Sequence, residues 1–339
     1  MTSPPIVDAH NDLLIELVFR ERRGESGPFA AHWLPALRSG GVALQVCPVF
    51  VDLPHLPERG LREALDQIGA FGRAIRENDH AVVAVRTLRD LDVVERGERT
   101  ALMLSCEGAE PLGYDPRLVE VMWELGVRML SLTWNRRNPF ADGAAETGGG
   151  GLSELGRKLV DLCVELGVVV DLAHTSEASY REVLERTGDA PVVVSHAACR
   201  AIYDHPRNLA DDALRALADR GGVLGVMLHP LAVDLSRPTL DRVVDHIDHA
   251  VEVMGIVHVG FGSDFTQQVV RALGWQPPPD SLLTEGLPPD AAIEGLAGPA
   301  DFPNLVEALR HRGYDDAQLA AVAGGNFLRL FERVLPERS

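Results

Sequence analysis

Two residues of metal-binding type stand two positions apart near the start of the chain. His10 and Asp12 directly follow a short apolar run, residues 6–9. Alternate residues of an extended strand point to the same side, so both side chains could face one point at the end of a strand. An imidazole and a carboxylate are suitable ligands for a borderline metal ion such as zinc. The pair therefore indicates half of a metal site, and the other ligands must come from other strand ends.

Further residues of these types follow other apolar runs. They are Glu107, His174, His196 and Asp264. Seen alone, a histidine at a strand end is more often a hydrogen-bonded structural residue than a ligand, and a lone carboxylate can cap a helix or begin a turn. The whole set is harder to explain in this way, because ionised carboxylates near an apolar core are costly unless they are paired or bind metal. The set therefore predicts a metal centre.

The number of candidate ligands indicates two ions. His10, Asp12, Glu107, His174 and His196 make one ligand more than a closed tetrahedral site takes. If Glu107 gave one oxygen to each ion, the two ions would lie about 3.5–4 Å apart. Some metal-dependent hydrolase barrels use a carboxylated lysine as the bridge. Lys158 is the only lysine of the chain and lies inside a helical pattern, so Glu107 is the candidate for the bridge.

The elements that must position these residues follow a regular alternation. Most of the β-type runs are too apolar for a half-exposed sheet and fit parallel strands covered on both faces. Eight such runs, separated by helix-like stretches, predict an α/β fold, a (β/α)8 TIM barrel, whose catalytic groups lie at the carboxyl ends of the strands. A doubly wound open sheet is the alternative. The runs are residues 6–9, 42–50, 100–106, 127–133, 168–173, 191–195, 222–228 and 258–263.

Helical spacing of apolar residues marks the stretches between the strands. Ser153, Ser176 and either Asp211 or Asp212 are the expected N-caps. Two polar stretches, residues 135–151 and 266–303, follow strands and are expected to be long loops on the catalytic face. Residues 304–334 are expected to form helices that seal the barrel, so residues 1–339 would make one domain. The helical stretches are residues 61–77, 153–165, 176–186, 211–219, 240–254, 304–312 and 317–334.

The composition narrows the class of partner. The 339 residues carry a formal charge of −18, which disfavours nucleic acid and anionic membranes as partners. No apolar run reaches the roughly 20 residues of a membrane span, and the first residues show neither the charged nor the apolar region of a secretory signal. The four cysteines are scattered and form no CxxC motif. We therefore expect a cytoplasmic protein with free thiols.

Together these residues carry a resemblance to a known family. The chain resembles the membrane dipeptidase (renal dipeptidase) family, peptidase family M19, of the amidohydrolase superfamily. The resemblance implies a barrel of the metal-dependent hydrolase type, two zinc ions, a homodimer, and hydrolysis of dipeptides, including some with a D-residue at the carboxyl end. The matching strings are His10-Asn11-Asp12, Glu107-Gly108, Ala173-His174-Thr175, Ser195-His196-Ala197, Pro206-Arg207-Asn208, Gly262-Ser263-Asp264-Phe265 and Gly324-Gly325-Asn326-Phe327.

The resemblance also implies roles for single residues. It assigns His10 and Asp12 to one zinc ion, His174 and His196 to the other, and Glu107 to both. Arg207 matches the arginine that binds the substrate carboxylate. Asp264 matches the aspartate that transfers protons.

Two places depart from the family pattern. After the aspartate the family often continues Phe-Asp-Gly, where this chain has Phe265-Thr266-Gln267. The family often has a histidine after the fourth strand, where this chain has Trp134. An indole can donate one hydrogen bond but cannot accept one or carry charge. Either Trp134 replaces the histidine at the substrate, or one of Arg136, Arg137 and His229 does, although a solvated loop position is the simpler expectation for these three.

The sequence thus predicts a zinc-dependent dipeptidase that uses a hydroxide bridging two metal ions. Its substrate would be a small dipeptide-like molecule with a free carboxylate. A related hydrolase that acts on N-acyl amino acids or lactones is the first alternative, and Trp134 keeps it open. A non-catalytic metal-stabilised binding protein is the second, but Asp264 supplies the proton-transfer group that such a protein would not need.

Overall fold

Eight parallel strands close into a barrel at the centre of the computed structural model, which describes residues 4–274, 282 and 287–337. The ring closes because β1 pairs with both β2 and β9, while β2 also pairs with β4. The predicted (β/α)8 barrel is therefore confirmed, and the open-sheet alternative is wrong. The strands of the ring are β1 (Ile6–Asp8), β2 (Val42–Phe50), β4 (Thr100–Glu107), β5 (Val127–Ser131), β6 (Val169–Asp171), β7 (Val192–Ala197), β8 (Val223–Val226) and β9 (Val259–Phe261).

A ninth strand, β3 (Val82–Ala84), lies outside the ring and was not predicted. It pairs in parallel with Thr100–Leu102, the amino-terminal part of β4, whereas β5 pairs with β4 further along. Three residues are too few to give a recognisable strand pattern.

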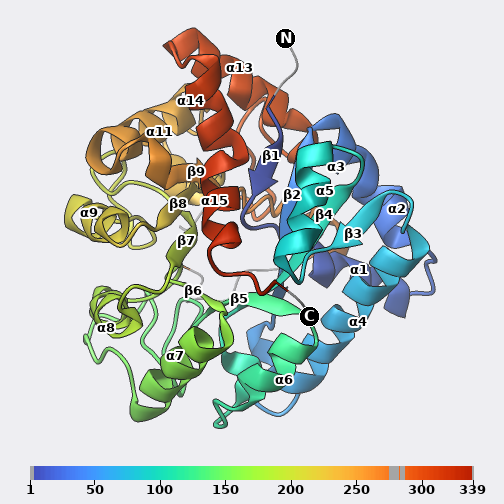
Figure 1. Ribbon diagram of the computed structural model, residues 1–339, viewed down its shortest axis with the longest axis vertical. Coiled ribbons are helices and arrows are strands. Elements are labelled where there is room, and N and C mark those ends of the chain that lie inside the picture. The colour runs from blue at the N-terminus through green and yellow to red at the C-terminus, as the bar shows by residue number, and fades with distance from the viewer. Residues whose placement is uncertain (1–3, 275–281, 283–286, 338–339) are drawn as a thin grey trace.

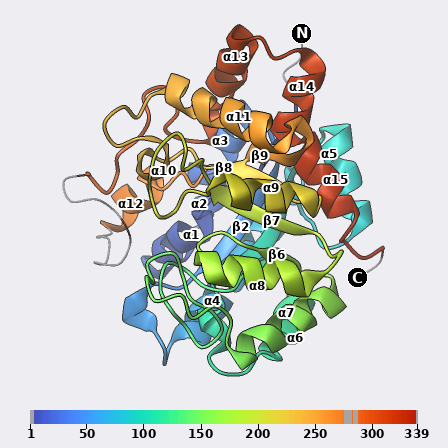
Figure 2. The same ribbon diagram turned by 90° about the vertical axis from the view of Figure 1, so that its left-hand side faces the viewer.

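Helices surround the barrel on its outer side (Figures 1 and 2). The helices predicted between the strands all form, and Ser153 and Ser176 accept the expected capping hydrogen bonds from the backbone N–H groups of Gly156 and Ser179. The N-cap of α9 is Ala210, so the expectation of an aspartate there is wrong. The helices predicted between strands are α4 (Gly60–Glu77), α7 (Glu154–Leu166), α8 (Glu177–Thr187), α9 (Asp211–Asp219) and α11 (Leu240–Met254).

The aspartates of α9 lie in its first turn rather than at its cap. Negative charge is favourable there because the backbone N–H groups of the first turn have no partner within the helix.

Several helices were not predicted from the sequence. α12 (Gln267–Leu273) occupies the first part of the expected loop 266–303, whose residues 275–281 and 283–286 lie outside the described residues. The strongest case is α1 (Leu13–Arg22), whose apolar residues lie on more than one face and so give no helical period. The others are α2 (Pro28–His32), α3 (Leu34–Ser39), α5 (Asp92–Arg96), α6 (Leu118–Glu124) and α10 (Pro230–Val233).

Three helices follow near the end of the chain, and the last of them covers the amino-terminal mouth of the barrel. α13 (Phe302–Arg312) is followed by α14 (Asp316–Ala320), a π-helical turn at Ala321–Gly325, and α15 (Asn326–Glu332), so the single helix expected over residues 317–334 is interrupted. The Asn326 side chain donates to the carbonyl oxygen of Val259 at the start of β9. α15 crosses the barrel axis in Figure 1.

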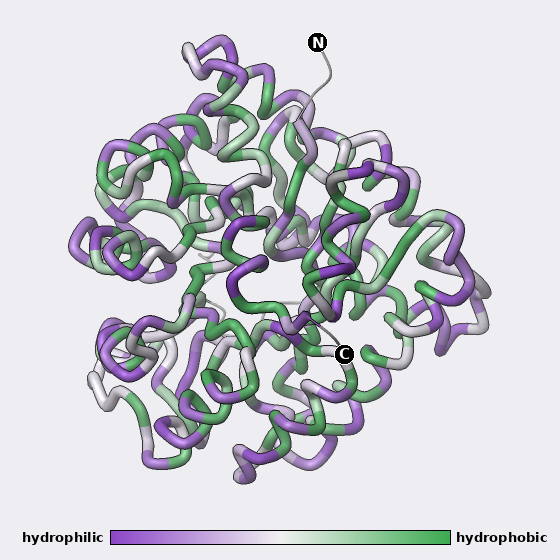
Figure 3. The backbone as a smooth tube through the Cα atoms, viewed as in Figure 1, coloured by the Kyte–Doolittle hydropathy of each residue, from purple (hydrophilic) through white to green (hydrophobic). Residues whose placement is uncertain are grey.

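The hydrophobic core has two main parts, one between strands and helices and one inside the barrel. Phe327, Leu330 and Phe331 of α15 pack inside the barrel with strand residues such as Val46 and Met103. Figure 3 shows hydrophobic stretches along the strands and hydrophilic ones on the outer helices and loops. Within the described ranges, no helix is both long and apolar enough to cross a lipid bilayer. The plug at one mouth leaves the opposite mouth, where the strands end, for a site.

Candidate metal centre

The six predicted metal-centre residues meet at the carboxyl ends of the barrel strands. His10 and Asp12 follow β1, and Asp264 follows β9 beside them. Glu107 is the last residue of β4, His174 follows β6, and His196 lies in β7. The barrel thus brings together residues that are as much as 254 positions apart in the sequence (264 − 10).

Glu107 lies between two groups of ligand atoms. Its Oε2 atom is 3.7 Å from Nε2 of His10, while its Oε1 atom is 2.7 Å from Nε2 of His174 and 3.5 Å from Nε2 of His196. On the first side, Nε2 of His10 is also 3.9 Å from Asp12 Oδ1 and 4.0 Å from Asp264 Oδ1. One carboxylate oxygen therefore faces each group.

Hydrogen bonds orient the imidazoles of His174 and His196. Nδ1 of His174 lies 2.7 Å from Oδ1 of Asn135, and Nδ1 of His196 lies 2.8 Å from Oγ of Ser195. The Ser195 hydroxyl donates to Oδ2 of Asp171 at 2.5 Å, so it can only accept from His196. Both histidines therefore carry their proton on Nδ1 and present an unprotonated Nε2 to the centre.

These two Nε2 atoms are only 2.7 Å apart. Two nitrogen lone pairs that face each other at this distance repel, and a cation held by both removes the repulsion. A metal-binding histidine commonly has its other ring nitrogen held by a polar group in this way.

Without a bound cation, burial disfavours the charged forms of the side chains in this cluster. It raises the pKa values of Asp12 and Glu107 well above their ordinary range, and neighbouring carboxylates raise them further. Burial also lowers the pKa of His10 to about 3 and those of His174 and His196 well below the usual value. A divalent cation would favour the ionised carboxylates, and neutral imidazole is the form that binds metal.

Unpartnered polar atoms give a second test of fit. Among the described residues, Nε2 of His10 and Oδ1 of Asp12 are buried and have no hydrogen-bond partner. Buried polar atoms are normally satisfied, so two such atoms facing one point indicate a ligand that is not protein. An imidazole and carboxylate set suits zinc and other borderline divalent ions.

Two residues of the centre have an unusual backbone. Of the described residues other than glycine, three have a positive φ angle, and two of these are His174 at 68° and Asp264 at 51°. Such conformations are uncommon for residues with a side chain and tend to occur at functional sites. The backbone N–H of Asp264 donates to the carbonyl oxygen of His10, which fixes its position beside β1.

Arg207 lies on the far side of the centre, next to the β6 and β7 ends. Its Nη2 group donates to the carbonyl oxygen of His196 at 3.2 Å and lies 3.1 Å from Nε2 of His174. Burial lowers its pKa to about 10, although nearby carboxylates, Asp264 first, act in the opposite direction. Arg207 therefore remains a cation at neutral pH, and it lines the pocket above the centre.

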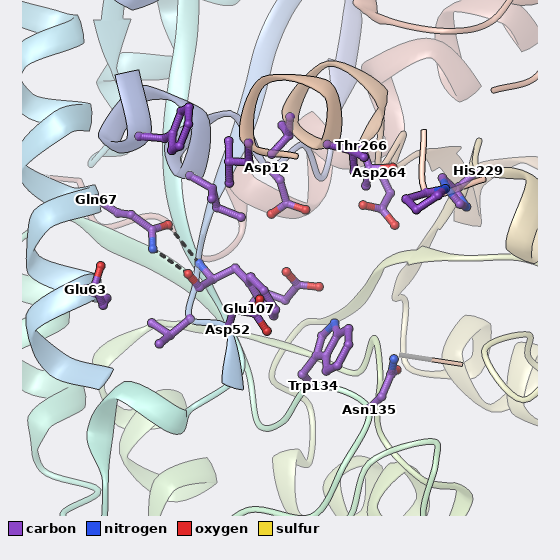
Figure 4. A pocket seen from close by; sticks show the side chains of 18 of the residues that line it. Asp12, Asp52, Glu63, Gln67, Glu107, Trp134, Asn135, His229, Asp264 and Thr266 are labelled. Atoms are coloured by element: carbon purple, nitrogen blue, oxygen red, sulfur yellow. Dashed lines mark hydrogen bonds between the residues drawn. The ribbon is translucent and has the colours of Figure 1, made fainter. Parts of the chain in front are cut away.

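A pocket of about 380 Å³ opens over these residues (Figure 4). It is lined by Asp12, Glu107, His174, Arg207 and Asp264 together with apolar side chains from α1 and α12. Pockets of this size suit small molecules. The arrangement can therefore place a small substrate against the metal-binding groups.

Comparison with known proteins places the chain in a family. The family model for membrane dipeptidase, peptidase family M19, matches residues 1–277. The chain belongs to the membrane dipeptidase family.

Two curated relatives and one solved structure are also similar to this chain. The chain is 32% identical to "Dipeptidase verJ" of Clonostachys rogersoniana over 81% of this chain and 66% of that protein. It is 31% identical to "Dipeptidase aclJ" of Aspergillus oryzae over 97% of this chain and 78% of that protein. A metallopeptidase of Rhodobacter sphaeroides, solved with a phosphinate mimic of the dipeptide L-Ala-D-Ala, superposes with a TM-score of 0.85 at 25% identity, covering 98% of this chain and 100% of that one. Family membership and these relatives support metallo-dipeptidase activity for this chain.

The tryptophan that departs from the membrane dipeptidase pattern lines the pocket. The Trp134 ring lies 5.5 Å from that of Phe50 and 5.9 Å from that of His174, and the guanidinium of Arg136 lies 5.3 Å above it. The indole therefore forms an aromatic wall of the pocket beside His174.

Of the other candidates to replace the missing histidine, Arg136 lies over the Trp134 ring, whereas Arg137 and His229 lie elsewhere. Arg137 is exposed and pairs with Asp142, and it does not line the pocket, as expected for a loop residue. His229 is buried and lines the pocket, so the expectation of a solvated position is wrong for it. Its Nδ1 accepts from the backbone N–H of Leu231 at 3.2 Å, which leaves its Nε2 to carry the proton.

The residues that support the ligands were not predicted from the sequence. Asn135 directly follows Trp134 in a polar loop, and nothing in its surroundings distinguishes it from other loop residues. Asp171 lies within an apolar run that predicts a buried strand. A charged residue in such a run indicates a supporting role, because buried carboxylates need partners. Asp8 gives the same signal in β1.

Proposed function

We propose that this chain is a dipeptidase with two zinc ions at the strand ends of its barrel. The observation that carries the proposal is the position of Glu107, whose Oε2 lies nearest to His10 and whose Oε1 lies nearest to His174 and His196. One tetrahedral ion needs only four ligands, and five candidate ligand residues lie together here. Imidazole and carboxylate ligands suit zinc, which is the ion we propose.

The ligand groups divide between the two ions. His10, Asp12 and Oε2 of Glu107 would hold one, and His174, His196 and Oε1 of Glu107 would hold the other. When bound, two such ions lower the pKa of a water molecule between them and polarise the scissile carbonyl group.

Asp264 is the proposed proton-transfer residue. Its side chain lies beside His10 and is 14% exposed, and desolvation raises its pKa to about 6 against the opposing effect of Arg207. A carboxylate in this place can accept a proton from the attacking water and then donate it to the leaving amine. Asp264 would therefore act first as general base and then as general acid.

Arg207 is the proposed binding residue for the substrate carboxylate. Its guanidinium is a buried cation that lines the pocket, and the geometry of this group suits a bidentate pair with a carboxylate. A longer peptide has no free carboxylate one residue after the scissile bond. This supports a dipeptidase rather than an endopeptidase.

The similar Rhodobacter sphaeroides metallopeptidase, bound to a mimic of L-Ala-D-Ala, supports the extension to L,D-dipeptides. Trp134 favours one alternative, a hydrolase of N-acyl amino acids or lactones, because it puts an aromatic wall where many family members have a histidine. Both reactions use the same ligands and the same Asp264.

The test is an activity panel on protein with a measured zinc content. Samples with zero, one and two equivalents of zinc are assayed against L,L- and L,D-dipeptides, N-acyl amino acids and lactones. We expect hydrolysis of dipeptides that becomes maximal at two equivalents. Maximal activity at one equivalent would refute the two-ion proposal, and activity confined to N-acyl amino acids or lactones would refute the dipeptidase.

A further inference from the structure

One face of α1 forms a wall of the pocket that begins at the metal centre. Asp12 precedes the helix, and Ile15, Val18, Phe19 and Arg22 line the pocket. These positions recur at intervals of three and four residues, which places them on one side of a helix. The wall therefore leads from a metal-ligand position, past three apolar side chains, to a charged residue.

Two further elements complete an apolar groove with α1. Val269, Val270 and Leu273 of α12, which packs beside α1, line the pocket, and Phe50 and Val51 line it from the end of β2. α12 follows β9, so all three walls grow from the neighbouring strands β9, β1 and β2.

The β2 wall is firmly held. The side chain of Gln67 in α4 accepts from the backbone N–H of Phe50 at 3.2 Å and donates to its carbonyl oxygen at 2.6 Å (Figure 4). The groove is thus formed by two helices and by a strand end whose backbone is fixed.

The groove lies across the metal centre from Arg207. The ring runs β1, β2, β4, β5, β6, β7, β8, β9, so β7 stands opposite β2 and β6 opposite β1. Arg207 contacts His174 and His196 at the β6 and β7 ends. Figure 4 likewise shows Gln67 and Glu63 on one side of the pocket and His229 on the other.

We propose that this groove, formed by Ile15, Val18, Phe19, Val51, Val269, Val270 and Leu273, binds a bulky apolar side chain on the amino-terminal residue of the dipeptide. The inference rests on the proposed function, because it requires the substrate carboxylate to lie at Arg207. With that carboxylate at Arg207 and the scissile carbonyl at the metal centre, the amino-terminal residue extends towards β1 and β2. Leucine, methionine and phenylalanine are the side chains of matching chemistry.

The length of the groove limits what it accepts. Ile15 and Phe19 are four residues apart on α1, which corresponds to about 6 Å along the helix and to the length of one large side chain. Beyond them the Arg22 guanidinium pairs with Glu63 at 2.7 Å and with Asp66 at 2.7 Å. A long acyl chain would have to cover these charges, so the groove fits one amino-acid side chain better than a fatty acyl group.

The expected preference is large enough to measure. Placing one or more methylene groups of a substrate in an apolar pocket changes kcat/KM by about 10–200-fold. We therefore expect kcat/KM for Leu-Ala, Met-Ala and Phe-Ala to exceed that for Gly-Ala by at least about 10-fold. Asp-Ala and Lys-Ala should fall below Gly-Ala, because a charged side chain would lose its hydration in the groove.

The first experiment compares two substrate series on zinc-loaded enzyme. The X-Ala series varies the amino-terminal residue, and the Ala-X series varies the carboxyl-terminal one. The proposal expects a steep dependence on apolar size in X-Ala. A flat X-Ala profile, or the same steep dependence in Ala-X alone, would overturn the groove assignment while leaving the dipeptidase intact.

The second experiment changes the groove itself. Phe19 is half-buried at the groove wall, so Phe19→Ala removes contact area at little risk to the fold. We expect kcat/KM to fall about 10-fold for Phe-Ala and to change little for Gly-Ala. Val121→Ala on the exposed side of α6, 50% exposed, is the matched control and should change neither.

The outcomes separate the two levels of the proposal. If Phe19→Ala lowers hydrolysis of both dipeptides equally, the groove does not select the side chain. If enzyme with two equivalents of zinc hydrolyses no dipeptide, the proposed function fails and the inference fails with it.

Discussion

Replacing Ser195 by alanine should weaken metal binding at one end of the centre only. Ser195 is fully buried, and its hydroxyl makes two contacts that alanine removes, with Oδ2 of Asp171 at 2.5 Å and with Nδ1 of His196 at 2.8 Å. Without an acceptor at Nδ1, the proton of His196 can move to Nε2, which then cannot bind a metal ion. The hydroxyl thus fixes the tautomer that the proposed site requires.

The magnitude follows from the kind of contact that is lost. Groups that orient a metal-binding histidine typically contribute about 10–100-fold in metal affinity, or about 1.4–2.8 kcal/mol. Asp171 also loses a charge-assisted hydrogen bond, which contributes about 1.5–3 kcal/mol to stability. We therefore expect one zinc ion to bind about 10–100-fold more weakly in Ser195→Ala while the other keeps its affinity.

The chain contains a closely matched control for this variant. Ser263 is also fully buried, and its hydroxyl lies 2.6 Å from Oδ2 of Asp8, but its other contact is the backbone carbonyl oxygen of His10 at 3.1 Å rather than an imidazole. Ser263→Ala should therefore destabilise the fold to a similar degree without changing a histidine tautomer.

The assay is a zinc titration against a chromophoric chelator, with metal content per chain measured after dialysis. Denaturant unfolding of both variants separates stability from affinity. Equal zinc affinities for Ser195→Ala and Ser263→Ala, or unchanged binding of both ions in Ser195→Ala, would refute the reasoning from the hydrogen bonds.

Three further predictions concern proton transfer, substrate binding and acid stability. Asp264→Asn should keep its zinc content while turnover falls by about 10²–10⁴-fold, and near-normal turnover would exclude the proton-transfer role. Arg207→Met should lower kcat/KM for free dipeptides by about 30-fold or more and lower it far less for C-terminally amidated ones, and an equal loss on both would exclude carboxylate binding. Burial lowers the pKa of His246 to about 4, so this residue stays neutral in the fold while the unfolded chain takes up a proton near its model value of 6.5. Its contribution to stability is therefore complete above pH 6.5 and is lost, by about 1.4 kcal/mol per pH unit, as the pH falls towards 4. In denaturant unfolding, the stability advantage of the wild type over His246→Gln should accordingly shrink between pH 7 and pH 4.5, and a constant difference would contradict the assignment.

Much of the fold could be read from local patterns. The eight barrel strands are short, strongly apolar runs, and their number and alternation with helices predicted the barrel. Ser153 and Ser176 were predicted as caps because a hydroxyl before an amphipathic stretch has one clear use. α1 escaped prediction because it packs on the core with one face and lines the pocket with another, so its apolar residues show no single period.

The sequence by itself determined which residue types stand at the strand ends. His10, Asp12, Glu107, His174 and His196 follow or end apolar runs, and the direction of a parallel strand then places all of them at one mouth of the barrel. This much depends only on each residue and its immediate neighbours. The family motifs added expected roles for these positions, which the proposed experiments test.

Only the tertiary structure decided how these residues face one another. Closing the ring places Oε2 of Glu107 near His10 and Oε1 near His174, and it brings Asp171 against the serine that orients His196. It also sets the apolar face of α1 across the centre from Arg207. These relations join residues far apart in the chain, and they depend on strand order and register, which no local pattern encodes.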